Sequence, residues 1–237
     1  MTDPARVDAY RAAADRVRAR IAEACARTGR DADDVTLVAV SKTVPAEALR
    51  DALAAGLDLL GENRVQEAAG KVAEVPGARW HLIGPLQSNK ARRAVEVFDA
   101  VQSVDSVELG GRLARLAEEL RPGTRFPILL QVNVDGDPNK AGLARDDLAD
   151  TVAQLAEHPT LDVRGLMTIG RLVDQPEAAR PTFQRLRELS ESLRAGGASL
   201  GPELSMGMTD DFEVAVEEGA TIVRIGRALF GARERAR

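Results

Sequence analysis

Lysine is the residue type whose placement in this 237-residue chain carries the most chemical information. Of the 32 basic residues only four are lysine: Lys42, Lys71, Lys90 and Lys140. Because arginine supplies nearly all of the general positive charge, we interpret a lysine as a candidate position where an amine is needed, and not merely a cation.

Lys42 ends an apolar run, residues 35–42, that is typical of a buried strand. Side chains alternate along a strand, so Val38, Val40 and Lys42 share one face. If the two valines pack inside a barrel, Lys42 lies at its mouth and points inward. Burial there would lower the pKa of the amine and leave it able to attack a carbonyl group. The alternative is that Lys42 reaches solvent or pairs with a carboxylate.

A second chemically suggestive group lies near the C-terminus. In the run that contains Arg224 and Gly226, these two residues alternate with aliphatic side chains. If the aliphatic side chains face the helices, Arg224 faces the barrel mouth. Gly226 would begin a loop whose backbone N–H groups can hold a phosphate, and Ser205 and Gly207 end the preceding run. A phosphate pocket opposite the Lys42 amine predicts a phosphorylated carbonyl ligand. The alternative is that the two glycines only permit tight turns.

Eight short apolar runs, rich in Val, Ile and Leu, must position these groups, and we interpret them as buried strands. The runs are 35–42, 57–64, 79–86, 100–105, 126–134, 163–170, 203–208 and 221–226. Amphipathic segments between the runs have apolar faces with helical spacing. These faces fall within residues 48–53, 109–120, 148–155 and 183–193.

Strict alternation of strand and helix predicts a parallel sheet, and eight units predict a single (β/α)8 TIM-type barrel of the α/β class. An open doubly wound sheet is the alternative, although no G-x-G-x-x-G follows the first strand. Residues 1–28 are expected to form an extra helix that covers the barrel, and residues 231–237 a short exposed tail. The chain has no linker composition, so we expect one domain, 1–237.

Composition argues against several classes of function. A net charge of −5 gives no bulk attraction to nucleic acid, although Lys90, Arg92 and Arg93 form a local basic cluster. Two histidines, of which His81 is expected to be a core residue, and one cysteine argue against a metal site. The single Cys25 fits a reducing compartment. Neither a signal peptide nor a membrane span is recognisable, so we expect a cytoplasmic protein.

Six segments, taken together, resemble one family of proteins. They are Val-Ala-Val-Ser-Lys-Thr (38–43), Gly-Glu-Asn-Arg-Val-Gln-Glu (61–67), Trp-His-Leu-Ile-Gly-Pro-Leu-Gln-Ser-Asn-Lys (80–90), Gly-Leu-Met-Thr-Ile-Gly (165–170), Leu-Ser-Met-Gly-Met-Thr-Asp-Asp-Phe (204–212) and Val-Arg-Ile-Gly (223–226). The chain is similar to the pyridoxal phosphate (PLP) homeostasis proteins, the YggS/PROSC family, which resemble the N-terminal barrel of alanine racemase. The resemblance runs over nearly the whole chain and implies a fold-type III PLP protein that lacks the second, β-rich domain of the racemases.

The resemblance also implies roles for particular residues. Lys42 would hold PLP as an aldimine, Asn63 would lie against the cofactor, and Arg224 would face the pyridine nitrogen. The phosphate would be bound by Ser205 and by the backbone around Gly226. The neighbouring positions complete the expected cofactor site: Met206, Gly207 and Ile225. Two positions depart from the common pattern of the family: Thr209 stands where Ser is frequent, and Arg227 where a small hydroxyl residue is frequent.

Whether such a protein catalyses a reaction depends on the groups around the cofactor. PLP is an effective electron sink when its pyridine nitrogen is protonated, and an arginine such as Arg224 disfavours that proton. Racemases of the resembling fold compensate with a lysine and a tyrosine on opposite faces. Here the sole tyrosine, Tyr10, lies in the N-terminal helix and is expected to be far from the strand ends.

We therefore expect a non-catalytic PLP carrier that supplies the cofactor to apo-enzymes. A weak PLP-dependent amino-acid racemase is the alternative, and a nucleic-acid-binding module is a third interpretation that the acidic charge disfavours. Lys140, in the loop after the fifth predicted strand, is a candidate acceptor of the aldehyde during release. An edge-free barrel of modest charge further predicts a monomer. The missing long apolar run predicts no membrane binding, and the few histidines and single cysteine predict no metal.

Overall fold

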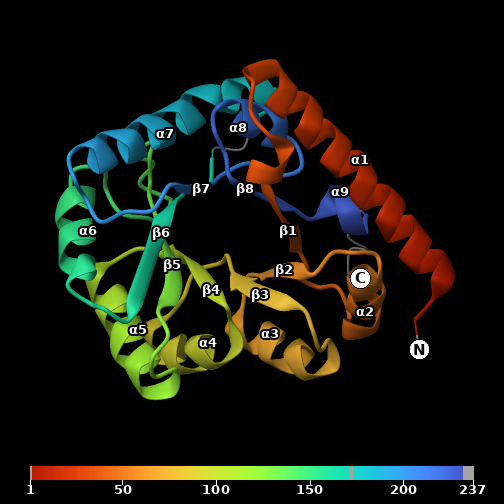
Figure 1. Ribbon diagram of the computed structural model, residues 1–237, viewed down its shortest axis with the longest axis horizontal. Coiled ribbons are helices and arrows are strands. Elements are labelled where there is room, and N and C mark those ends of the chain that lie inside the picture. Colours follow the sequence, from red (N-terminus) through yellow and green to blue (C-terminus); the bar gives the residue numbers. More distant parts are fainter. Residues whose placement is uncertain (1, 171–172, 232–237) are drawn as a thin grey trace.

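The computed structural model describes residues 2–170 and 173–231. Eight parallel strands pair in chain order and close into a barrel, because β8 pairs with β1 as well as with β7 (Figure 1). The strands are β1 (Thr36–Val40), β2 (Leu59–Glu62), β3 (Arg79–Leu82), β4 (Ala100–Val104), β5 (Phe126–Gln131), β6 (Leu161–Met167), β7 (Glu203–Ser205) and β8 (Ile222–Ile225). The predicted barrel is confirmed.

Every predicted run overlaps a strand, but β6 begins two residues before its run, and several strands end earlier than the sequence indicates. The first run was expected to extend to residue 42, whereas β1 ends at Val40. The seventh was expected to reach residue 208, whereas β7 ends at Ser205. The chain turns out of the barrel beyond both ends, with positive φ angles of 67° at Thr43 and 91° at Gly207. Lys42 therefore lies in a turn that follows the strand.

The helices surround the barrel (Figure 1). They are α1 (Pro4–Thr28), α2 (Ala46–Ala54), α3 (Val65–Lys71), α4 (Ala91–Val97), α5 (Val107–Leu120), α6 (Leu148–Ala156), α7 (Arg180–Ala195), α8 (Phe212–Glu217) and α9 (Arg227–Phe230). The four apolar faces read from the sequence lie in α2, α5, α6 and α7. The faces of α3, α4, α8 and α9 were not identified, because four to seven residues are too few to show a helical period.

Helix α1 has clear start and stop signals and packs along one side of the barrel. The Asp3 side chain accepts a hydrogen bond from the Ala5 N–H at 3.0 Å, with Pro4 in the first turn. Gly29 ends the helix in the left-handed region, with φ 68°. The buried side, which includes Val17 and Ile21, packs against α2, α8 and α9. The extra N-terminal helix is thus confirmed, whereas the predicted tail beyond residue 231 lies outside the described residues.

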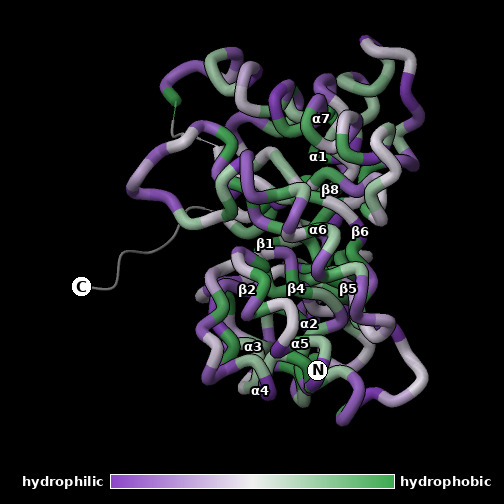
Figure 2. The backbone as a smooth tube through the Cα atoms, turned by 90° about the vertical axis from the view of Figure 1, so that its left-hand side faces the viewer, coloured by the Kyte–Doolittle hydropathy of each residue, from purple (hydrophilic) through white to green (hydrophobic). Residues whose placement is uncertain are grey.

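Apolar side chains form two layers, one inside the barrel and one between the strands and the helices. The interior cluster consists of Val38, Leu59, Leu129, Met167 and Ile222. Alternate residues of the same strands face outward, and Figure 2 shows the hydrophobic colour concentrated in the strands and the helix sides that cover them. On β8 this alternation directs Arg224 into the barrel.

Within the described part of the chain, no helix is both long enough and apolar enough to cross a membrane.

Candidate functional site

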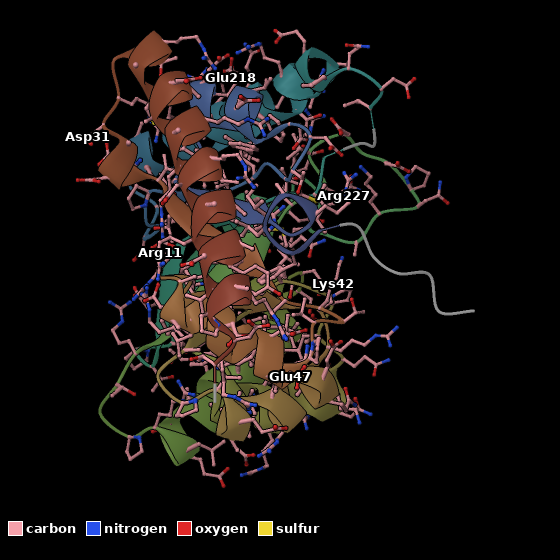
Figure 3. The ribbon with its side chains drawn as sticks, turned by 90° about the vertical axis from the view of Figure 1, so that its right-hand side faces the viewer. Arg11, Asp31, Lys42, Glu47, Glu218 and Arg227 are labelled. Atoms are coloured by element: carbon pink, nitrogen blue, oxygen red, sulfur yellow. The ribbon has the colours of Figure 1, made fainter. Side chains whose placement is uncertain are left out.

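Lys42 lies beside a cavity of about 300 Å³ at the carboxyl ends of β1 and β8. The cavity walls include Val40 and Thr43 from the first strand and its turn, and Gly226 and Arg227 from the last. Barrel closure makes these two strands neighbours, although they are nearly 190 residues apart in sequence, as the pairing of Ala39 with Ile225 shows. Lys42 and Arg227 lie on the same side of the molecule in Figure 3.

Tyr10 lines the same cavity, so the prediction that it lies far from the strand ends is wrong. Its ring packs edge-on against Phe230 of α9, with 5.3 Å between the ring centroids. Sequence reasoning missed this contact because α1 and α9 stand at opposite ends of the chain and meet only through tertiary packing. A tyrosine is protonated at neutral pH, and burial raises the pKa of the Tyr10 hydroxyl further above its ordinary value.

A chain of hydrogen bonds crosses the barrel interior beneath this level. Arg224 donates to the Ser205 hydroxyl at 2.6 Å and to the Thr168 carbonyl at 2.8 Å. Ser205 donates to the Gln102 side chain at 2.7 Å, and the Gln102 amide lies 2.8 Å from Nδ1 of His81. His81 is therefore the hydrogen-bonded interior residue that we predicted. Burial lowers its pKa to about 4, so the ring is neutral at pH 7.

The guanidinium of Arg224 is a buried cation without a carboxylate hydrogen-bond partner in the described part of the chain. Burial lowers its pKa to about 10, and the charge of Asp211 opposes that shift. A guanidinium has five N–H donors, and two go to Ser205 and Thr168. Donors thus remain for a further acceptor, and the buried guanidinium would disfavour an acceptor that carried a proton and a positive charge.

Ser205 was predicted to contact a phosphate, but its hydroxyl is occupied by Arg224 and Gln102 inside the barrel. The side chains of Met206 and Ile225 are fully buried in the layer that faces the helices, which leaves only their backbone for a ligand. Gly207 has φ 91°, and a Cβ there would approach Ala215 of α8 to 2.6 Å. Glycine at 207 is thus required for helix packing as well as for the turn.

Arg227 is a site residue that the sequence had left in doubt. It is exposed, forms an ion pair with Asp210 and lines the Lys42 cavity. Arginine in place of a small hydroxyl residue put a side-chain phosphate contact at position 227 in doubt and left the backbone contact intact. The guanidinium at the cavity wall offers a different type of phosphate ligand, one with bidentate geometry.

Two predicted residues line other hollows. Asn63 borders a hollow with Pro85 and Lys90, on the side of β2 and β3. Lys140 borders a larger one with Thr209, where its amine donates to the carbonyl of Ile169 at 3.2 Å. The structure therefore brings Lys42, Gly226 and Arg227 together, while Asn63 and Lys140 line separate hollows at the same end of the barrel.

The closed parallel barrel is a fold that the N-terminal domain of alanine racemase also has. The model of the family "Alanine racemase, N-terminal domain" matches residues 13–234. Over 223 residues the chain is 48% identical to the pyridoxal phosphate homeostasis protein of Pseudomonas aeruginosa, covering 92% of this chain and 94% of that protein. A protein of that name from Aquifex aeolicus is 41% identical over 221 residues, covering 92% and 96%. The chain belongs to the pyridoxal phosphate homeostasis protein family, as the resemblance implied.

Solved structures show the same relationship. PipY of Synechococcus elongatus, in its structure with PLP bound, matches with a TM-score of 0.78 and 44% identity, covering 89% of this chain and 100% of that one. Alanine racemase of Clostridium difficile matches with a TM-score of 0.74 and 14% identity, covering 95% of this chain and 57% of the racemase. At that identity the racemase establishes the fold alone.

Proposed function

We propose that this protein binds PLP in the Lys42 cavity and serves PLP homeostasis as a carrier. One observation supports this most directly: Lys42, which supplies an amine, and Arg227 and Gly226, which can bind a phosphate, line the same cavity of about 300 Å³. The 44% identical PipY, whose structure has PLP bound, agrees with this assignment.

Each residue has a distinct role in the proposal. PLP brings an aldehyde that condenses reversibly with an amine, and a pyridine ring that can withdraw electrons. Lys42 supplies the amine, and Arg227 with the backbone of Gly226 holds the phosphate. Arg224 offers its remaining donors to the ring nitrogen, which fits a neutral acceptor. Asn63, Ser205, Met206, Gly207 and Ile225 stay in the proposal as predicted neighbours, with Ser205 acting through Arg224.

Two side chains, Arg224 and Tyr10, bear on whether the protein carries PLP or catalyses a reaction with it, and on balance they favour a carrier. Arg224 remains a hydrogen-bond donor and keeps the ring nitrogen unprotonated, which weakens electron withdrawal. Tyr10 lies in the Lys42 cavity, and this favours racemisation as a second candidate function, because two bases could then flank a substrate. The direction of its pKa shift argues the other way, because burial makes the tyrosinate that would act as a base still less populated than in an ordinary tyrosine.

The proposal also covers where the protein acts and which partners it has. The carrier would pass PLP to apo-enzymes, act as a monomer and single domain in the cytoplasm, and need neither nucleic acid nor membrane. Lys140 remains a proposed acceptor during release, from the neighbouring hollow at the barrel mouth. The single buried Cys25 agrees with a reducing compartment.

Borohydride reduction followed by peptide mass mapping tests the binding site. With PLP added, wild-type protein is expected to absorb near ~420 nm, and reduction is expected to fix the pyridoxyl group on Lys42. The Lys42→Ala variant should lack both signals, while Lys90→Ala serves as the matched control and should retain them. A label on another lysine, or none in protein saturated with PLP, would contradict the proposal.

A further inference from the structure

A cluster of three charged side chains lies directly beneath the turn that carries Lys42. The Lys71 ammonium, at the end of α3, donates to the Ser41 carbonyl at 3.0 Å and to one oxygen each of Glu62 and Glu67, both at 2.7 Å. An ammonium has three protons, and all three are used. The Lys71 side chain is 11% exposed and that of Glu62 is fully buried.

Both neighbours of Lys42 are tied to this cluster. The Thr43 N–H donates to the same Glu67 oxygen at 2.5 Å, and the Ser41 hydroxyl donates to Glu62 at 2.7 Å. Lys42 thus projects from a turn whose two flanking residues are anchored to Lys71, directly through the Ser41 carbonyl and indirectly through the two carboxylates.

The turn needs such anchoring because Thr43 is strained. It has φ 67°, the only positive φ at a residue other than glycine among those the structure describes. A β-branched residue is disfavoured in this region, and the conformation persists only where surrounding contacts impose it. Glu67 supplies the contact to the Thr43 N–H.

The cluster itself is costly to bury. Burial raises the pKa of Glu62, against the hydrogen bonds from Lys71 and Ser41, and its second oxygen has no hydrogen-bond partner in the described structure. Apolar residues of similar volume often replace a buried ion pair without loss of stability. A buried ionic cluster next to a strained turn is therefore better explained by the geometry that it imposes than by the stability that it adds.

We propose that Lys71, Glu62 and Glu67 form a positioning cluster that holds the Ser41–Thr43 turn and aims the Lys42 amine into its cavity. The inference rests on the proposed function of Lys42, and it gives a role to a second of the four lysines. Three converging acceptors suit a compact ammonium, whereas the planar fork of an arginine does not match them. The retention of lysine at position 71, in a chain rich in arginine, agrees with this role.

The test combines a substitution that removes the Glu67 hydrogen bond to the turn with one that relieves the strain at Thr43. Glu67→Ala is expected to weaken PLP binding at Lys42 about tenfold, because the turn loses its imposed conformation. Glycine adopts a φ of 67° freely, so Thr43→Gly should restore most of the lost affinity in the double variant. The effects of the two substitutions should thus be clearly non-additive.

Two further variants sharpen the result. Lys71→Arg is expected to bind PLP as weakly as Lys71→Met, because only an ammonium satisfies the three acceptors. Glu74→Ala is the matched control, since Glu74 is an acidic neighbour of α3 whose carboxylate pairs with Arg50 at 3.7 Å, away from the turn. It should bind PLP as the wild type does.

The outcomes separate this inference from the proposed function. Additive effects of Glu67→Ala and Thr43→Gly, or unchanged affinity in Glu67→Ala, would overturn the inference while leaving PLP binding by Lys42 intact. Hydrogen exchange at the Thr43 amide gives a readout that needs no PLP. It should be slower in wild type than in Glu67→Ala, and equal rates would overturn the inference even if wild-type protein did not bind PLP at Lys42.

Discussion

At the scale of single residues, the hydrogen-bonded chain from Arg224 to His81 joins a charged interior group to a neutral one. Burial lowers the pKa of both side chains, but Arg224, at about 10, stays a cation at pH 7, whereas His81, at about 4, is neutral. Ser205 and Gln102 connect the two side chains, donating and accepting in one direction. The Ser205 hydroxyl therefore accepts its hydrogen bond from Arg224 and donates its own proton to Gln102.

Ser205→Ala should leave one buried guanidinium donor unpaired and lower the free energy of unfolding by about 1–3 kcal/mol. Urea denaturation measures the change. Ser190→Ala is the matched control, because Ser190 is equally buried but its hydroxyl has no hydrogen-bond partner in the described structure. The control is expected to be near neutral, and an equal loss in both variants would refute the assigned role of Ser205.

The neutrality of His81 predicts a pH dependence of stability. Its pKa is about 4 in the folded protein and 6.5 ordinarily, so between these values the unfolded chain binds a proton that the folded chain does not. Stability therefore falls as pH falls through this window, with a His81 contribution of at most about 1.4 kcal/mol per pH unit.

Unfolding by urea at pH 7 and pH 5 tests this contribution. His81→Gln should lose less stability than wild type between the two values, because glutamine does not titrate. His158→Gln, in the loop after α6, controls for the loss of a histidine as such. Parallel pH profiles for wild type and His81→Gln would show that His81 does not contribute.

At the scale of elements, helix α1 is both a cover and a wall of the site. It contributes Tyr10 to the Lys42 cavity, and Arg20 anchors it to α8 through two hydrogen bonds to Glu213, at 3.0 and 2.7 Å. The Arg20 guanidinium also lies 4.5 Å from the centroid of the Phe212 ring. These contacts, more than two turns away along the helix, and the direct packing of Tyr10 on Phe230 together hold the Tyr10 end of α1 against the barrel.

Packing beneath α1 should dominate its contribution to stability. Ile21 is 3% exposed, and Ile21→Ala is expected to lower the free energy of unfolding by roughly 2–4 kcal/mol through lost burial and the cavity left behind. Chemical denaturation provides the measurement. Arg16→Ala, on the exposed side of the same helix, should change stability by less than about 0.5 kcal/mol. Similar effects in both variants would show that α1 is not tightly packed.

At the scale of the whole molecule, the main contrast is between the described barrel and the racemases that share its fold. The match covers 95% of this chain but 57% of the Clostridium difficile racemase, so that enzyme contains a large part without a counterpart in the match. Within the barrel Arg224 is buried, while Tyr10 and the exposed Arg227 line the Lys42 cavity. Under the proposed function, these groups suit binding of a reactive aldehyde more than proton abstraction.

Purified protein loaded with PLP is therefore expected to show no appreciable alanine racemisation, measured by chiral chromatography. Tyr10→Phe should keep the absorbance near ~420 nm, because the hydroxyl is not needed for binding. Turnover of about one per second or more would lie within the ordinary range of enzymes and contradict the carrier proposal. Loss of that turnover in Tyr10→Phe would identify the tyrosine as its base.

Much of this molecule is predictable from the sequence because its information is local. Each strand is a short apolar run bounded by polar or glycine residues, and the longer helices show their period directly, as in α5 and α7. Alternation along the last run correctly predicted that Arg224 lies on the inner face of β8, although the side chain is buried inside the barrel and does not line the cavity at its mouth. The turn conformation at Thr43 was not predictable, since threonine rarely adopts a positive φ and the cause lies in Glu67, 24 residues away.

The sequence by itself determined the order of strands and helices, the closed barrel, the family and Lys42 as the candidate amine, because all of these follow from periodicity and contiguous motifs. Only the tertiary structure decided which side chains meet. It placed Tyr10 beside Lys42, engaged Ser205 with Arg224, separated Asn63 and Lys140 into other hollows, and brought Lys71 beneath the turn. The physical reason is that these contacts join segments that are distant in the chain. How close such segments come in space is determined only by barrel closure and helix packing.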